Sequence, residues 1–426
     1  KAGQLWSGTF HSIFAKILRK YSSLLGFPST FTIYDGSDAK NAIKLCIKEL
    51  QLDEKIYKPN VVLSRISAAK NNLVTAEAYM NNHVAIQNDM KSGKGKICEV
   101  YRLYAKKCKT DSVMDFDDIL LYMNILLRDF PEVTSELRSQ ISHILVDEYQ
   151  DTNMAQYHIV KKIAQESRNI TVVGDDSQSI YAFRGARIQN ILNFKKDYPE
   201  AKEFRLEQNY RSTQMIVNAA NSVIVHNSNR LKKDCFSEGE IGEKIELLRS
   251  FNEVEEAAAV VNSITKRIFA TKCSYDSFTV LYRTNSQSRV IEEALRRRNI
   301  PYKIFAGHSF YERKEIKDVL AYMRLVINHN DNDAFRRVVN FPARGIGATS
   351  MEYLQNCARD NNVSLWDAID APEVLNYGLK GAAIQKFRAF KELVSRFSTM
   401  LQSDDAYDLA KKIEDELEYP GQIKVN

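Results

Sequence analysis

Two acidic side chains stand directly after a short apolar run, where a parallel sheet commonly binds its ligand. The run Ile144–Val146 is typical of a buried strand, and Asp147 and Glu148 follow it at once. Open α/β sheets bind ligands at the carboxyl ends of their strands. Carboxylate oxygens suit Mg²⁺, and one acid can hold the metal while its neighbour activates a water. The alternative is that the two acids simply begin a polar loop.

A second polar cluster, GDDSQSIYAFRGA, follows the next predicted strand, Ile170–Val173. Gln178 in this string could contact a phosphate. Tyr181, Phe183 and Arg184 place two rings and a cation close together. Rings stack on nucleic-acid bases, and an arginine adds cation–π and phosphate contacts. Judged on spacing alone, packing of the two rings into a core is an equally simple interpretation.

Two further strings are suited to phosphate. LEQNYRST follows a predicted strand, and Ser212 or Thr213 is a good N-cap for a helix, so Arg211 would lie beside a helix N-terminus and could bind a phosphate. In FPARGIGATS, two glycines flank an isoleucine and allow a tight turn whose N–H groups can approach a phosphate of a duplex backbone. A surface arginine and a plain interhelical turn are the respective alternatives.

The elements that must position these residues are mostly helices, because 16 glycines and 8 prolines are few for 426 residues. Apolar spacings of three and four predict helices at 10–25, 39–50, 100–107, 119–127, 213–226, 254–269, 287–298 and 312–327. Strands are predicted at 144–146, 170–173, 203–206, 245–248, 278–282 and 302–305. Buried strands alternating with helices indicate an α/β fold with a parallel sheet.

Helical units without strands are expected before Ile144 and after about Asn328, with KSGKGK at 91–96 as a flexible basic loop. Composition fits a globular chain, with 44% hydrophobic and 27% charged residues. A net charge of +6 is too small to prove a nucleic-acid partner. No apolar run is long enough to span a membrane. Six cysteines without a CxxC pair make a zinc ribbon or a disulfide scaffold unlikely and fit a reducing, cytoplasmic location.

Five strings occur in one order along the chain: GTFHS at 8–12, DFDDIL at 115–120, ILVDEYQDTN at 144–153, VVGDDSQSIYAFRGA at 172–186 and LEQNYRST at 206–213. Together they closely resemble the UvrD/PcrA/Rep family of superfamily 1 DNA helicases. VLYRTNSQSR and FPARGIGATS also look like that family, and the likeness is weakest in about the last 70 residues. The resemblance implies an α/β fold of P-loop NTPase, RecA-like lobes with parallel sheets, incomplete here, and two largely helical inserted subdomains.

The resemblance also implies a division of the chain into four regions. Residues 1–16 and 141–205 would form part of the first RecA-like lobe, with 17–140 as a helical insertion. Residues 206–304 would form part of the second lobe, and 305–426 part of a helical outer subdomain.

Roles in nucleotide chemistry follow from the same resemblance. Asp147 matches the acid that holds Mg²⁺, and Glu148, its neighbour in the metal site, matches the acid that activates the attacking water. Gln178 matches the glutamine that contacts the γ-phosphate. Arg211 resembles the arginine finger on that phosphate, and Tyr210 the tyrosine that stacks on adenine. ATP and Mg²⁺ are therefore the implied cofactors.

Roles in DNA binding are implied as well. Family positions that contact single-stranded DNA fall on Thr9, His11, Phe116, Tyr181, Phe183 and Arg184, with Arg283 and Asn285 as weaker candidates. Some relatives carry Trp where this chain has Phe183, and stacking should survive that change. Without the resemblance, His11 would be interpreted as a structural histidine. The Gly345, Ile346 and Gly347 turn matches an element that the family uses in its mobile outer subdomain.

These matches predict an ATP-dependent 3′-to-5′ DNA helicase or translocase. It would act on single-stranded DNA and at junctions with duplex, with repair or replication proteins as candidate partners and no membrane. The sequence contains no GxxxxGK[ST] loop, no T-x-H-x-x-K-G string and no VALTRA-like helix. The chain is therefore expected to be an internal fragment that alone does not hydrolyse ATP at a meaningful rate. The helicase part of a helicase–nuclease and a non-catalytic DNA- or partner-binding module are the alternatives.

Overall fold

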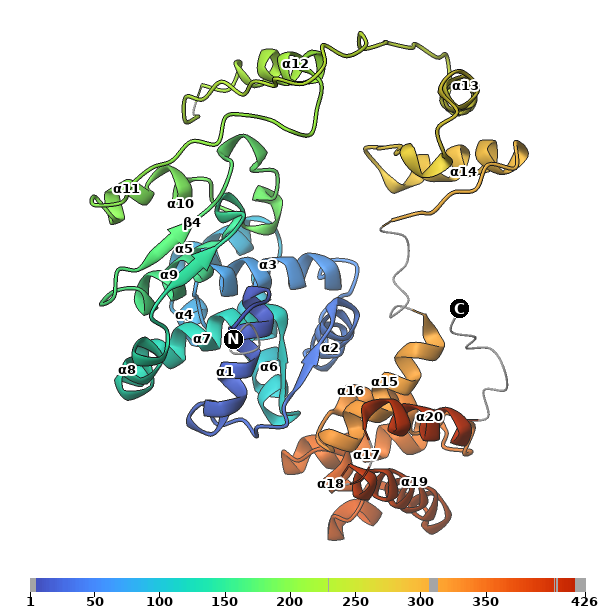
Figure 1. The fold of residues 1–426 in the computed structure, drawn as a ribbon. Coiled ribbons are helices and arrows are strands. Elements are labelled where there is room, and N and C mark those ends of the chain that lie inside the picture. Colours follow the sequence, from blue (N-terminus) through green and yellow to red (C-terminus); the bar gives the residue numbers. More distant parts are fainter. Residues whose placement is uncertain (1–4, 229, 306–312, 402, 404, 418–426) are drawn as a thin grey trace. The chain divides into compact units, whose positions relative to one another are not determined.

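The computed structural model describes residues 5–228, 230–305, 313–401, 403 and 405–417. The chain forms two compact units: the first comprises residues 1–202 together with 313–426, and the second comprises residues 203–312. Helices dominate both units, as the ribbon in Figure 1 shows. No helix in the described ranges combines the length and the apolar character that crossing a lipid bilayer requires.

The first unit contains a parallel pair of strands, β3 (Ile144–Val146) and β4 (Ile170–Val172). Both strands were predicted and are confirmed, but the prediction that they are buried is wrong, since Leu145 is 79% exposed and only Val146 of the two strands is buried. Helices α1 (Phe10–Tyr21), α7 (Phe116–Asp129), α8 (Pro131–Gln140) and α9 (Met154–Ile163) share one apolar core beside them. This part of the unit also contains short helices: η2 (Ser22–Leu25), η3 (Tyr149–Asp151), η4 (Asp176–Gln178), η5 (Ala182–Arg184), α10 (Gln189–Leu192) and α11 (Phe194–Asp197).

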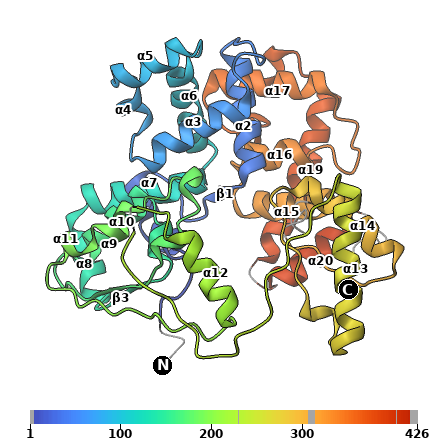
Figure 2. The ribbon, with the colours of Figure 1, turned by 90° about the horizontal axis from the view of Figure 1, so that it is seen from above.

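An insertion with its own apolar core lies between α1 and α7 in the sequence. It contains α2 (Gly36–Glu49), α3 (Pro59–Asn71), α4 (Ala76–Met80), α5 (His83–Lys91) and α6 (Ile97–Thr110), which Figure 2 shows gathered together. The prediction that no strand precedes Ile144 is wrong. β1 (Thr32–Tyr34) pairs in parallel with β2 (Val113–Asp115). Each strand has three residues and runs into a capping aspartate, Asp35 or Asp115, so the sequence shows no alternating run.

The C-terminal part of the first unit is helical, as predicted. It contains α15 (Lys314–Ile327), α16 (Asn332–Val338), α17 (Ala348–Asn361), α18 (Leu365–Ala368), η9 (Pro372–Tyr377), α19 (Gly381–Met400) and α20 (Ala406–Glu416). Their apolar core, with Phe335 and Phe390 fully buried, shares no residue with the cores of the preceding helices.

Polar side chains join this C-terminal part to the insertion. Asn328 Nδ2 donates to the carbonyl oxygens of Asp111 and Ser112, at 3.0 Å each. Arg324 pairs with Asp38 of α2 at 2.6 Å and with Asp331 at 2.8 Å. We call this set of contacts the polar seam.

The second unit contains α12 (Gln214–Ile224), η6 (Tyr275–Ser277), α13 (Glu253–Thr271), η7 (Asn285–Gln287) and α14 (Ser288–Arg297). Its small core is formed by Val261, Ile264, Leu295 and Ile300. The helices predicted here, and those predicted in the first unit, are confirmed to within a few residues at their ends.

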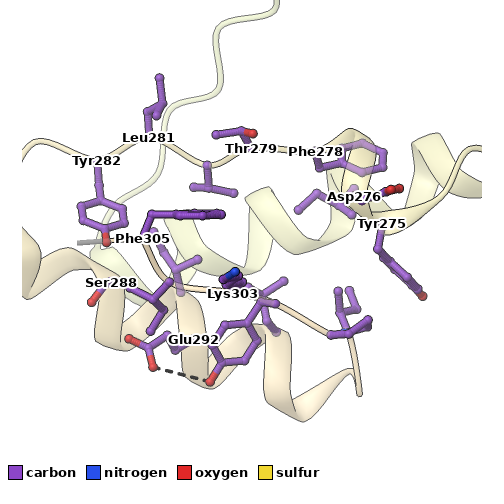
Figure 3. A pocket seen from close by; sticks show the side chains of 18 of the residues that line it. Tyr275, Asp276, Phe278, Thr279, Leu281, Tyr282, Ser288, Glu292, Lys303 and Phe305 are labelled. Atoms are coloured by element: carbon purple, nitrogen blue, oxygen red, sulfur yellow. Dashed lines mark hydrogen bonds between the residues drawn. The ribbon is translucent and has the colours of Figure 1, made fainter. Parts of the chain in front are cut away.

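The four strands predicted in the second unit are wrong for the residues described. Segments 203–206, 245–248, 278–282 and 302–305 form no ladder, and the unit has one isolated bridge, Gln208 to Phe236. A strand exists only where a neighbour shares its backbone hydrogen bonds, and no such neighbour lies alongside within the described part of this unit. Two of these segments instead line an open, mainly apolar cavity of about 950 Å³. Figure 3 shows Phe278, Leu281 and Tyr282 on one side of it and Ser288 and Glu292 of α14 on the other.

Candidate nucleotide and nucleic-acid site

The ends of β3 and β4 bring two polar clusters to one edge. Because Val146 lies opposite Val172 in a parallel register, the residues after both strands emerge side by side. The pairing continues beyond the strands, since Val173 N donates to Val146 O at 2.8 Å and Tyr149 N to Val173 O at 2.9 Å. Asp147 and Glu148 therefore stand next to the loop that carries Gln178, and both acids are exposed to solvent.

Glu148 has a backbone conformation that is unusual for a residue with a side chain. Its φ is 49° and its ψ is 43°, in the left-handed region. Such a residue costs about 1–2 kcal/mol relative to the right-handed conformation. Local bonds hold it there, because Glu148 N donates to Asp147 Oδ1 at 2.9 Å and Gln150 Nε2 donates to Glu148 Oε2 at 2.7 Å. Backbone strain of this kind is concentrated at functional sites.

Gln178 ends the short helix η4 and is exposed. Its Nε2 donates to Asp175 Oδ2 at 2.9 Å, and the other oxygen of Asp175 accepts from Ser177 N at 2.9 Å. Asp175 thus holds the loop in shape while the Gln178 amide faces the solvent at the strand edge.

The acids fit a magnesium ion that carries phosphate oxygens and waters. In the described ranges, no three His, Cys, Asp or Glu side chains gather to hold an ion by themselves. Mg²⁺ at phosphate sites uses one or two carboxylates and takes its other ligands from substrate and water. Asp147 and Glu148, exposed at a strand end, are a donor set of that kind.

Tyr181, Phe183 and Arg184 form one exposed cluster after the same loop. The two ring centroids lie 6.1 Å apart, and the guanidinium carbon of Arg184 lies 5.1 Å and 5.5 Å from them. Phe183 is 79% exposed, so the core-packing interpretation of this ring is wrong. A flat ring and a guanidinium at the surface can stack on bases and contact their phosphates.

His11 and Phe116 form a second aromatic pair, although they lie far apart in the sequence. Their ring centroids are 5.7 Å apart at 83°, and Phe116 is 51% exposed at the start of α7. Burial lowers the pKa of His11, although Asp117 acts in the opposite direction. Thr9 caps α1 by accepting from Ser12 N and stands two residues before His11.

Tyr210, Arg211, Arg283 and Asn285 belong to the second compact unit, whereas the two acids and Gln178 belong to the first. Tyr210 and Arg211 are both exposed, and the Tyr210 hydroxyl donates to Gln208 Oε1 at 2.7 Å. Thr213 is the N-cap of α12, as the sequence allowed. Arg283 is exposed, and Asn285 lines the 950 Å³ cavity.

The Gly-Ile-Gly segment forms a tight turn before α17. Gly345 has a φ of +67°, which favours glycine, and Gly347 is the N-cap of the helix. Ile346 points into the core at 4% exposure, and its N–H donates to Asn340 Oδ1 at 3.1 Å. That N–H is therefore already used within the protein.

Sequence reasoning did not identify two residues that lie beside these sites. Lys386 of α19 donates to Gly345 O at 2.9 Å and adds a cation to the turn, but it lies 41 residues away. Gln150 belongs to the string ILVDEYQDTN and follows Glu148 by two residues, but the partners of its amide are apparent only in three dimensions.

Comparison with known proteins agrees with these features. Residues 1–199 match the UvrD/REP helicase N-terminal domain family, and residues 204–396 match the UvrD-like helicase C-terminal domain family. The ATP-dependent DNA helicase PcrA of Leuconostoc citreum is 43% identical over 393 residues, covering 92% of this chain and 52% of the relative. The proteins of the same name from Staphylococcus epidermidis and Staphylococcus aureus are 40% and 39% identical over 421 residues, covering 99% of this chain and 56% of each relative. The chain thus spans about half the length of these curated relatives.

Proposed function

Because the chain belongs to the UvrD/PcrA/Rep family of superfamily 1 helicases, we propose that it provides the hydrolytic acids and the DNA-facing rings of an ATP-dependent DNA helicase or translocase. Its direction on single-stranded DNA would be 3′ to 5′, and its pathway repair or replication. The observation that supports this most is the parallel register of β3 and β4, since it sets Asp147 and Glu148 beside the Gln178 loop.

Each residue at the strand edge has a task in this proposal. Magnesium-bound ATP, when present, supplies the phosphoryl group that is transferred to water. Asp147 would hold the metal, and Glu148 would orient a water and accept its proton. Gln178, tied to Asp175 on one side, would donate to the terminal phosphate on the other. We assign Arg211 a second contact with that phosphate and Tyr210 the adenine ring, supported by the LEQNYRST match and by their exposure.

The exposed rings supply the second half of the function. Stacking of a base on an aromatic ring contributes about 1–3 kcal/mol and tolerates any sequence. We propose that Tyr181, Phe183 and Arg184 bind one part of a single strand and that Thr9, His11 and Phe116 bind another. Since Phe183 follows Gln178 by five residues, movement of the loop when phosphate leaves would also move the ring. Arg283, Asn285 and the Gly345–Gly347 turn would add contacts to DNA backbone.

Replacing the water-activating acid tests the proposal. In the protein at its natural length, Glu148→Gln should abolish DNA-stimulated phosphate release and leave nucleotide binding in place, because the amide cannot accept the proton. Glu132→Gln, at an exposed acid of α8, is the matched control and should turn over normally. Unchanged turnover in Glu148→Gln would contradict the assignment.

The 426 residues by themselves should bind single-stranded DNA but release little phosphate from Mg-ATP. Their sequence has no GxxxxGK[ST] loop to clamp the β- and γ-phosphates. A phosphate-release assay with the purified chain, Mg-ATP and single-stranded DNA measures this, and a robust DNA-stimulated rate would contradict it.

A further inference from the structure

Gln150 is a buried amide with two partners that fix its orientation. It is 1% exposed and lies between the ends of β3 and β4. Its Nε2 donates to Glu148 Oε2 at 2.7 Å, and its Oε1 accepts from Asp175 N at 3.0 Å. A carboxylate only accepts and a backbone N–H only donates, so the two ends of the amide cannot be exchanged.

The neighbouring backbone leaves room for this amide and for little else. A Cβ added to Gly174 would lie 2.5 Å from Gln150 Oε1, closer than real Cβ atoms approach an oxygen. The φ of Gly174 is not in the left-handed region, so what this position requires is space rather than an unusual conformation. Gly174 and Gln150 therefore form one fitted pair beneath the strand edge.

The bonds of Gln150 complete a continuous path between two of the proposed catalytic residues. Glu148 accepts from Gln150, Gln150 accepts from Asp175 N, and Asp175 Oδ2 accepts from Gln178 Nε2 at 2.9 Å. The three hydrogen bonds are joined through the side chains of Gln150 and Asp175, and all of them lie within one compact unit.

We propose that Gln150 is a positioning residue that aims the Glu148 carboxylate at the attacking water and ties that aim to the loop carrying Gln178. This inference rests on the proposed ATP hydrolysis and goes beyond it by giving a role to a residue that would not touch nucleotide, metal or water. When the Gln178 loop moves, Asp175 N moves with it, and the pull on Gln150 changes the orientation of Glu148. Hydrolysis is then competent only when the loop is in place.

The variant Gln150→Glu tests this with almost no change in shape. It keeps an oxygen for Asp175 N but places a second carboxyl against Glu148, where the amide donated. A carboxylate cannot donate, so Glu148 loses the hydrogen bond that orients it. The like charges also push Glu148 out of position.

In the protein at its natural length, the expected result is a fall in DNA-stimulated kcat of about 10- to 100-fold, the usual effect of losing a partner that orients a catalytic group. The KM for ATP should change less than about twofold, because aiming Glu148 at the water affects the transition state and not the binding of ATP. Gln140→Glu is the matched control, because Gln140 Nε2 also donates to a glutamate, Glu136, at 3.0 Å but on the exposed surface of α8.

Two results would overturn the inference. Turnover of Gln150→Glu equal to that of Gln140→Glu would show that the amide does not aim Glu148. A loss of kcat that comes with an equal loss of ATP affinity and a lower melting temperature would show that Gln150 only stabilises the fold. Glu148→Gln, measured alongside, separates these results from failure of the proposed function, because unchanged turnover in that variant implicates the hydrolytic assignment itself.

Discussion

Two acidic strings of the first unit are built from the same residue types and have opposite surroundings. Asp115 and Asp118, in the string DFDD, are buried against Lys70, whose ammonium lies 2.6 Å and 2.7 Å from them and is 1% exposed. Asp147 and Glu148, at the end of β3, are open to solvent and have no lysine or arginine within ion-pair distance among the described residues. We call the first the sealed cluster and the second the open edge.

The difference shows how one kind of side chain serves structure in one place and chemistry in another. In the sealed cluster Asp115 caps α7 and accepts from the Tyr104 hydroxyl at 2.8 Å, and Lys70 of α3 supplies the opposite charge. This fixes the start of α7 and so directs Phe116 outward to His11. At the open edge the carboxylates keep their capacity for a metal, a water or a proton. Stability should therefore depend on the first and turnover on the second.

Removing the cation of the sealed cluster should have the largest effect on stability. Lys70→Met leaves two buried carboxylates without their partner, which typically costs about 3–5 kcal/mol. Urea denaturation of the 426-residue chain measures it, with Lys106→Met at an exposed lysine of α6 as the control. Similar midpoints for the two variants would remove the distinction between the cluster and the edge.

The sealed cluster should also make stability depend on pH. Burial and the charge of Asp115 raise the pKa of Asp118 to about 7, despite the opposing effect of Lys70. The folded state then binds a proton that the unfolded chain, with a pKa near 3.8, has released. Stability from this group is complete below that lower value and is lost as the pH rises through 7. Between pH 5.5 and 7.5 it should fall by about 2 kcal/mol.

Denaturation midpoints at the two pH values test this, with Asp118→Asn as the comparison. That variant keeps a side chain of the same size but has no carboxyl to titrate. Its stability should vary less over the same range, and an equal slope in both proteins would assign the pH dependence to other groups.

In the loop that follows β4, Phe183→Ala should weaken DNA binding without affecting folding. One lost stacking contact corresponds to about 1–2 kcal/mol of binding free energy. Fluorescence anisotropy with a labelled single strand measures it on the 426-residue chain. Phe269→Ala is a fitting control, because that ring is also about four-fifths exposed, on α13. Equal affinities of the two variants would exclude the ring from the DNA surface.

The sequence predicted the helices and the strands β3 and β4 because those patterns are local. The buried face of a helix consists of apolar residues three or four positions apart, such as Phe14, Ile17 and Leu18 of α1. The runs 278–282 and 302–305 carry an equally good strand pattern, yet their fate depends on a partner that a local pattern cannot report. The strands β1 and β2 were too short to show alternation at all.

The open edge could be predicted in outline for the same reason. Asp147, Glu148 and Gln178 follow recognisable strands, so the rule of strand ends brings them together. The partners of these residues could not be found in this way. Neither the burial of Lys70 nor the bond between Gln150 and Asp175 N can be recognised from sequence spacing, because each depends on segments 25 to 48 residues away.

The polar seam has a calorimetric consequence. Heat-capacity change on opening a protein arises mainly from apolar surface that becomes hydrated, whereas polar surface changes it in the opposite direction. Asn328, Arg324 and their partners would exchange one set of hydrogen bonds for another with water, and the apolar cores on either side would stay closed. Separation along the seam should therefore lower the heat capacity slightly, whereas melting of either core should raise it.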